Sequence, residues 1–277
     1  MDKFLKHSRR IETTDLDWEL AARVGISATE AEVLTYFADI EGQTIFYLKE
    51  LLMTNAARDP EVVAFLTTWN YEEFFHAEGI AQLLEVCGHP LEQGRKTEVR
   101  TGVQLSAKVE AAAQTLLSKL FPSSFPTLSM TWGASQEMLT LRGYEQLTRT
   151  TENPVLAELC RRIAKQERRH FAWYYNNART RLAESKMARR LTRRIFSAFW
   201  SPVGAGVKSD TEVAKLCARL FPGQRFLEVA AEIDAKMARL PGLEGLNVIE
   251  DYAHRALITG TDRQLAAGND NQLAASA

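Results

Sequence analysis

The segment YEEFFHAE, residues 71–78, places ionisable side chains where a buried helix face needs apolar ones. With a helical period, one face of this region carries Phe65, Trp69, Glu73, His76, Ile80 and Leu83 or Leu84. A buried carboxylate without a partner is costly or becomes neutral, so Glu73 and His76 would need partners inside the protein. For a single E-x-x-H motif, an exposed helix face is the simpler interpretation.

A second E-x-x-H motif repeats the pattern in KQERRHFAW, residues 165–173. Glu167 and His170 interrupt an apolar stripe that otherwise consists of Leu156, Cys160, Ile163 and Tyr174. Two further helical stripes contain one glutamate each. Glu41 lies on the stripe of Leu34, Phe37, Ile45 and Leu48, and Glu137 on that of Met130, Ala134, Leu141 and Tyr144.

The spacing of these glutamates indicates a duplicated arrangement. Glu41 precedes Glu73 by 32 residues, and Glu137 precedes Glu167 by 30. A unit of helix, glutamate, helix and E-x-x-H therefore occurs twice, which predicts two antiparallel helix pairs related by a pseudo-twofold axis. Four carboxylates and two imidazoles in the middle of such a bundle are typical of a carboxylate-bridged dinuclear metal centre. The alternative is a buried polar network without metal.

Charge and ligand chemistry indicate which metal the set would hold. Two divalent ions carry four positive charges, which four ionised glutamates neutralise. Mixed oxygen and imidazole ligands suit iron or manganese rather than a thiolate-bound metal. We expect two iron ions (Fe2+/Fe3+), with a mixed manganese–iron pair as the alternative, and O2 as the co-substrate. Because metal-bound histidines usually donate their second N–H to an outer acceptor, we expect Gln166 to orient His76 and Glu72 to orient His170 across the bundle.

The helical period dominates the whole chain and predicts an all-α fold, a four-helix bundle with additional flanking and C-terminal helices. A capping box at Thr29–Glu32 would open the first helix, which runs to about Met53. The other expected helices are 59–87, 103–120, 127–150, 154–182, 185–199, 209–220, 224–239 and 244–257. We expect one domain over 1–260, with its core at 28–183 and accessory helices at 185–258, and a disordered tail at 261–277.

Composition narrows the class of protein. The chain has 277 residues and a formal net charge of −1, which argues against a nucleic-acid binder. Its cysteines, Cys87, Cys160 and Cys217, form no C-x-x-C pair, and their sparse use suits a reducing compartment. The start of the chain lacks the apolar core of a signal peptide, and no stretch reads as a membrane span. These features predict a cytoplasmic protein that is not transmembrane.

Three segments resemble the soluble acyl-acyl carrier protein desaturases of the ferritin-like superfamily. WNYEEFFHAE (69–78) is similar to the desaturase W-x-x-E-E-x-x-H-x-D/E, SQEMLT (135–140) to Q-E-x-x-T, and QERRH (166–170) to D-E-x-x-H. The similarity covers about residues 30–180. It implies a ferritin-like bundle with Glu41 and Glu137 as terminal ligands, Glu73 and Glu167 as bridging ligands, and His76 and His170 as terminal imidazoles.

The resemblance also implies a catalytic threonine. Thr140 lies one turn after Glu137, and the matching desaturase threonine is associated with O2 activation and proton delivery. The alternative is a hydroxyl bonded back to the carbonyl of residue 136. Two departures are visible: the desaturases carry Asp where this chain has Gln166, and DIEGQT (39–44) replaces their double glutamate and proline.

The expected function is a di-iron oxidase or oxygenase that desaturates or hydroxylates an aliphatic substrate, such as a free or carrier-bound fatty acyl group. Electrons would come from a separate ferredoxin or reductase. The alternatives are an N-oxygenase or other oxidase of an amine-containing metabolite, and a non-catalytic iron-binding or ferroxidase protein. A long apolar tunnel beside Thr140 would favour acyl chains, and a short polar pocket would favour amines.

The basic segment 179–194 suggests a partner surface. It carries seven basic residues against one acid, Glu184, and could dock an acidic acyl carrier protein or an anionic membrane surface. The alternative is the solvated face of an accessory helix. The oligomeric state is left open, with a homodimer among the options.

Overall fold

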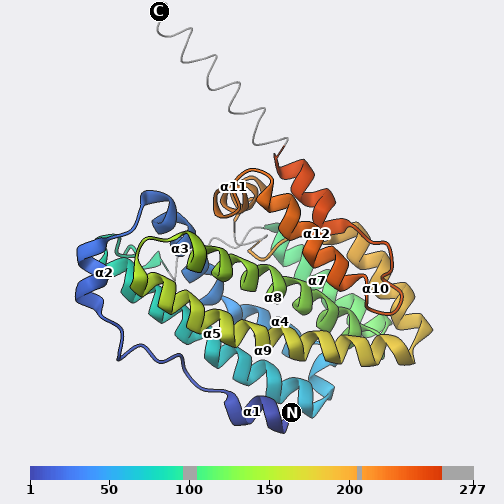
Figure 1. Cartoon of the computed structure of the whole chain (residues 1–277). Coiled ribbons are helices and arrows are strands. Elements are labelled where there is room, and N and C mark those ends of the chain that lie inside the picture. Colours follow the sequence, from blue (N-terminus) through green and yellow to red (C-terminus); the bar gives the residue numbers. More distant parts are fainter. Residues whose placement is uncertain (96–104, 205–207, 258–277) are drawn as a thin grey trace, which may run out of the picture.

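A computed structural model describes residues 1–95, 105–204 and 208–257, and all regular structure within these ranges is helical (Figure 1). The all-α prediction is therefore confirmed for the described part of the chain. The predicted disordered tail, 261–277, lies outside it. The elements are α1 (Asp2–His7), α2 (Trp18–Val24), α3 (Ala28–Glu41), α4 (Thr44–Leu52), η1 (Asn55–Arg58), α5 (Pro60–Val86), α7 (Leu105–Leu120), α8 (Phe125–Thr150), α9 (Pro154–Glu184), α10 (Lys186–Phe199), α11 (Asp210–Leu220), α12 (Arg225–Met237) and a last helix at 248–257.

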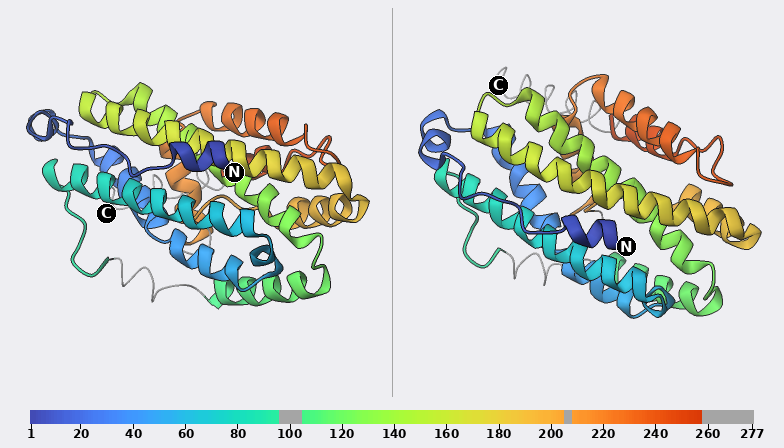
Figure 2. Two further views of the ribbon diagram at one scale, coloured as in Figure 1. Left: turned by 90° about the horizontal axis from the view of Figure 1, so that it is seen from below. Right: turned by 60° about the horizontal axis from the view of Figure 1, so that its bottom comes forward.

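Helices α3, α5, α8 and α9 form the centre of the molecule (Figure 2). Helices α8 and α9 are joined by residues 151–153 and pack along their lengths, and α3 packs on α5 in the same way. Both E-x-x-H helices start where the sequence predicts, because Asp59 and Asn153 cap them and a proline occupies the first turn of each. The two helix pairs meet through α5 and α9.

The first predicted helix is wrong in two details. It is not continuous from residue 29 to 53, because α3 ends at Glu41 and α4 begins at Thr44. The Thr44 hydroxyl donates to the carbonyl of Glu41 at 2.9 Å, and so satisfies an acceptor that the break leaves unpaired. The break turns α4 out of the phase of α3, which is why Ile45, predicted to be buried, is 44% exposed.

The capping box of α3 also differs from the prediction. It is formed by Ser27 and Glu30 rather than by Thr29 and Glu32. The Ser27 hydroxyl accepts from the N–H of Glu30, and the Glu30 carboxylate accepts from the N–H of Ser27. Ser27 is the capping residue because it precedes the helix in an extended conformation, whereas Thr29 already lies inside the first turn.

The N-terminal region is a further part of the fold that the sequence did not predict. Helices α1 and α2 are short, and the non-helical residues between them run along the α5–α9 side of the bundle (Figure 2). We call residues 8–16 the N-terminal strap. Phe4, which precedes the strap, and Ile11, within it, are both buried.

The C-terminal helices cover α8. Phe196 of α10 makes an edge-to-face contact with Trp132 of α8, and α11 and α12 also pack on α8. A β-carbon at Gly143 would lie 2.7 Å from the ring of Phe37 and 3.1 Å from Leu220 of α11, so glycine permits the close approach of three helices. The described helices include none with the length and apolar character needed to cross a bilayer.

Part of the basic segment serves the fold. Arg189 donates to the carbonyls of Leu182 and Ala183 at the end of α9. Arg193 donates to the carbonyls of Gly242 and Glu244. These two arginines link α10 to the end of α9 and to the loop at residues 242–244. The docking role of the segment stays a prediction.

The buried carboxylate of Asp234 caps the N-terminus of the last helix. Asp234 of α12 accepts from the N–H groups of Ile249 and Glu250 through one oxygen, while its other oxygen has no hydrogen-bond partner among the described residues. Burial raises the pKa of Asp234 to about 6. A carboxyl with a raised pKa in the folded state favours folding at low pH, and that contribution is lost as pH rises through 6.

We therefore expect Asp234→Asn to stabilise the protein at pH 8 by roughly 1–2 kcal/mol, because the amide keeps the acceptor oxygen and removes the buried charge. The gain should shrink towards pH 4. Urea unfolding at both pH values measures it, with the exposed Glu184→Gln as the charge-removal control. A variant less stable than the parent at pH 8 would contradict the prediction.

Candidate metal centre

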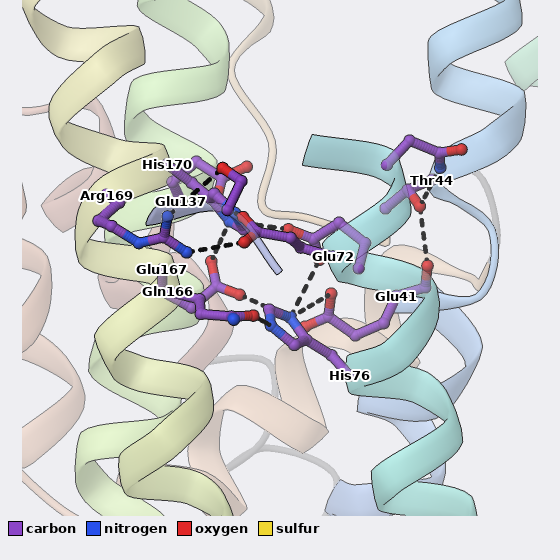
Figure 3. Close-up of polar contacts among 12 residues, drawn as sticks. Glu41, Thr44, Glu72, His76, Glu137, Gln166, Glu167, Arg169 and His170 are labelled. Atoms are coloured by element: carbon purple, nitrogen blue, oxygen red, sulfur yellow. Dashed lines mark hydrogen bonds and ion pairs between the residues drawn. The ribbon is translucent and has the colours of Figure 1, made fainter. Parts of the chain in front are cut away.

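The six predicted ligands lie together at the middle of the bundle. Each central helix contributes: Glu41 from α3, Glu73 and His76 from α5, Glu137 from α8, and Glu167 and His170 from α9 (Figure 3). None of these residues is more than 6% exposed. They form two overlapping groups, each with ligand atoms within 4.8 Å of one another. One group is Glu41, Glu73, His76 and Glu167, and the other is Glu73, Glu137, Glu167 and His170.

Helix geometry explains why the two groups overlap. The i, i+3 spacing puts the glutamate and the histidine of each motif on one helix face. The His76 Nδ1 atom lies 3.1 Å from Glu167 of the opposite helix, and His170 Nδ1 lies 3.0 Å from Glu73. Glu73 and Glu167 therefore belong to both groups, and the two imidazole rings are 6.0 Å apart.

Gln166 meets His76 across the bundle. The Nε2 atom of His76 lies 2.7 Å from Gln166 Oε1, and the Gln166 amide nitrogen donates to the carbonyl of Arg9 at 2.8 Å. Since the amide nitrogen is used by Arg9, its oxygen must face His76, which then donates through Nε2–H. When a metal ion is bound, a ring held in this way would be neutral and would offer its Nδ1 lone pair to the metal.

Glu72 makes the equivalent contact with His170. His170 Nε2 lies 2.8 Å from Glu72 Oε2, while Glu72 Oε1 accepts from Arg169 at 2.7 Å and from the N–H of Arg9 at 2.9 Å. Burial raises the pKa of Glu72, but the hydrogen bonds from His170 and Arg169 outweigh it, so the pKa is lowered overall. Both cross-bundle contacts expected from the sequence are present, one to a neutral amide and one to a carboxylate.

The centre contains buried polar atoms that the described residues do not satisfy. Glu73 Oε1, His76 Nδ1, His170 Nδ1 and both carboxylate oxygens of Glu167 have no hydrogen-bond partner there. Buried polar groups are normally paired, so a set of unpaired ligand atoms facing one centre needs an explanation. Oxygen and imidazole donors in two groups of four fit a pair of hard or intermediate divalent ions. The residues therefore fit the metal centre that the sequence predicts.

Without metal, protons balance the charge of the cluster. Burial, together with the neighbouring carboxylates, raises the pKa of Glu41 and of Glu137 well above the usual range. Burial lowers the pKa of each histidine, but close contacts with the surrounding carboxylates outweigh burial and raise it. These directions favour protonation of the cluster when no cation neutralises its carboxylates.

Tyr144 lies next to the centre, although the sequence assigned it no role. Its hydroxyl donates to Glu41 Oε1 at 2.6 Å, and its ring stacks on Phe37. Burial and the adjacent Glu41 raise the pKa of Tyr144 well above 10, so the phenol keeps its proton. The only feature of the sequence that indicates a place for Tyr144 near the centre is its position two turns after Glu137 on the same stripe.

Thr140 differs from the other threonines in the body of α8. Thr131, Thr148 and Thr150 each donate to the carbonyl four residues earlier. The Thr140 hydroxyl makes no such bond to Gln136, and the described residues offer it no hydrogen-bond partner. The structure therefore does not show the alternative in which the Thr140 hydroxyl bonds back to the carbonyl of residue 136. The hydroxyl stays available for another partner, one turn after Glu137.

Two hollows of about 390 Å3 each lie away from Thr140. One is bordered by Asp39, Ala77 and Arg95, and the other by Tyr36, Lys208 and Arg219. Neither is lined by Thr140 or by a predicted metal ligand. These two hollows therefore do not decide between acyl and amine substrates.

Comparisons of the chain with protein-family models, with curated proteins and with solved structures return no match. The residues that converge on the centre are consequently the basis for a functional assignment.

Proposed function

We propose that this protein is a ferritin-like oxidase or oxygenase whose dinuclear metal centre, formed by two iron ions, uses O2 to oxidise an aliphatic substrate. The observation that carries the proposal is the convergence of four buried glutamates and two buried histidines with unpaired ligand atoms. A purely structural network would instead satisfy its buried polar atoms internally. The four carboxylates match the charge of two divalent ions, so the loaded centre is neutral.

The metal pair, when bound, would supply Lewis acidity and electrons for O2 reduction. For desaturation, a CH2–CH2 unit, O2, two electrons and two protons give an alkene and two waters. For hydroxylation, the same inputs give an alcohol and one water. In either case two electrons must come from an external donor, such as a ferredoxin or a reductase.

The protein's own residues would hold ligands and protons. Glu73 and Glu167 would bridge, because each belongs to both groups, while Glu41 and Glu137 would each serve one. Tyr144 holds a proton on its phenol oxygen next to Glu41. Thr140 presents a free hydroxyl beside Glu137, where it can donate a proton or hold a water. The C-terminal helices cover α8 and would exclude bulk water from this side.

The aliphatic substrate is supported by the resemblance of segments 69–78, 135–140 and 166–170 to the desaturase motifs. Anaerobic loading with Fe(II), followed by O2 and a chemical reductant, tests the proposal with a panel of free fatty acids, acyl thioesters and amines. New alkene or alcohol products support it, and N-oxidised amines support the amine alternative. Consumption of O2 with ferric iron as the only product would identify a ferroxidase.

We expect Thr140→Ala to slow the reaction of the loaded protein with O2 by about 10- to 100-fold while leaving two metals per chain, because the hydroxyl makes no hydrogen bond to a described residue. Stopped-flow absorbance and metal analysis measure the two quantities. Thr148→Ala, on the same helix, is the control, since its hydroxyl bonds back to Tyr144. Equal loss of metal and reactivity would show that Thr140 is structural.

A further inference from the structure

The main chain of Arg9 contacts both residues that hold the histidines. Its N–H donates to Glu72 Oε1 at 2.9 Å, and its carbonyl accepts from Gln166 Nε2 at 2.8 Å. Glu72 in turn meets His170, and Gln166 meets His76. One residue of the N-terminal strap therefore links the two histidines of the centre, although it lies 63 residues from Glu72 and 157 from Gln166.

The strap is anchored on both sides of Arg9. Before it, Phe4 packs on Phe65 at 4.9 Å and lies 6.1 Å from the His170 ring. After it, Arg162 of α9 donates to the carbonyl of Glu12 and pairs with Asp15. The Arg9 side chain itself is exposed. The position of its peptide groups thus comes from the anchored strap and not from its side chain.

The Arg9 carbonyl has a consequence for His76. A glutamine side chain can present either its oxygen or its NH2 group to a neighbour, because the two ends are nearly the same size. A flipped Gln166 would direct a donor at Nε2 of His76, which favours the tautomer with the proton on Nδ1. That proton would occupy the lone pair aimed at the carboxylates. The carbonyl of Arg9 prevents the flip by accepting from the Gln166 nitrogen.

The Arg9 N–H acts on the other histidine. It is one of three donors that hold the Glu72 carboxylate, together with Arg169 and His170. These three donors fix the orientation of the Glu72 carboxylate, so it accepts from His170 Nε2 and leaves Nδ1 free to bind metal.

We propose that the main chain of Arg9 is a positioning element of the metal centre, which sets the metal-binding orientation of both histidines at once. This inference rests on the proposed function, because it assigns the contact to a metal site. It predicts that detaching the strap weakens metal retention at both positions, although the strap contains no ligand.

The test compares two proline variants of the full chain. Arg9→Pro removes the N–H that Glu72 accepts, and Ser8 before it is already extended (φ −80°, ψ 127°), as a following proline requires. Arg10→Pro inserts the same ring one residue later, where no hydrogen bond of the N–H is found among the described residues. Each variant is loaded with Co(II), and release of the metal to excess chelator is followed by its visible absorbance.

We expect Arg9→Pro to release Co(II) at least tenfold faster than the parent and to change the Co(II) spectrum, in line with the effect of removing outer partners of metal-bound histidines. Arg10→Pro and Arg9→Ala, which both keep the Arg9 N–H donor and carbonyl acceptor, should match the parent. Release at the parental rate in Arg9→Pro, or equal acceleration in both proline variants, would overturn the inference. Failure of the parent to bind two Co(II) ions would instead count against the proposed function.

A second pair of variants decides the question if Arg9→Pro does not fold. Arg162→Ala frees the strap beyond Arg9, while its neighbour Arg161→Ala removes only an exposed ion pair with Glu158. We expect faster Co(II) release in Arg162→Ala alone, with both variants giving parental circular dichroism. A lower melting temperature with unchanged metal release would show that the strap is merely structural.

Discussion

Glu73→Ala is expected to lower metal binding from two ions to fewer than one per chain. Glu73 belongs to both groups of ligand atoms, and its Oε1 lies 3.0 Å from His170 Nδ1. Removal of a shared ligand takes one oxygen from each position and leaves one negative charge too few for two divalent ions. Anaerobic loading with Fe(II) or Co(II), removal of free metal and elemental analysis measure the stoichiometry.

The matched control for this experiment lies on the same helix. Glu85 of α5 is exposed and lies nine residues after His76, so Glu85→Ala should keep two ions. Circular dichroism of both variants establishes that the helices remain. If Glu73→Ala retains two ions, or if the parent binds fewer than two, the dinuclear centre is refuted.

The second large effect is a metal-induced rise in melting temperature that grows with pH. In the metal-free protein, the pKa values of His76, His170, Glu41 and Glu137 are raised. Groups with raised pKa values favour folding below their unfolded pKa, and this contribution is lost as pH rises through their folded pKa. Above about pH 6.5, the metal-free protein should therefore become less stable as pH increases.

Metal removes this dependence, because bound ligands have already lost their protons. Glu73 and Glu167, whose pKa values are lowered, add no slope in this range because they are ionised throughout it. With free Co(II) at 100 times its Kd, one site contributes about 2.7 kcal/mol, which corresponds to roughly 5–10 °C in a chain of this size. The shift should be larger at pH 8 than at pH 6.5.

Thermal unfolding with and without Co(II), at both pH values, measures the effect. Glu73→Ala should lose most of the metal-induced shift, while Glu85→Ala should keep it. A shift of equal size at both pH values would show that metal does not replace protons in the buried cluster.

The sequence predicts most helices and the composition of the centre because both follow from local regularities. Helix α5 begins at Pro60, as the Asp59 cap requires, and its stripe of Phe65, Trp69, Glu73 and His76 is buried. Two polar positions on an apolar stripe are visible in one sequence, since a helix repeats its faces every three to four residues. The motif in α9 has the same spacing and also lies on an apolar stripe, so the same regularity predicts it.

The break between α3 and α4 escaped prediction because it depends on contacts from elsewhere. Gly42 alone is a weak signal, and an apolar stripe that continues through Ile45 suggests an uninterrupted helix. The Thr44 hydroxyl closes the end of α3 and also accepts from Asn70 of α5 at 2.8 Å. A contact between residues 26 positions apart, in different helices, has no periodic signature in the sequence.

The sequence by itself determined that four helices would carry four glutamates and two histidines inward, because apolar periodicity fixes which side chains a helix buries. Only the tertiary structure decided what holds that set in place. The main chain of Arg9 binds Gln166 and Glu72, and Tyr144 binds Glu41. Peptide groups are the same in every residue, so a contact made by the backbone of an exposed arginine leaves no trace in side-chain identity. It arises only when the N-terminal strap packs across α5 and α9.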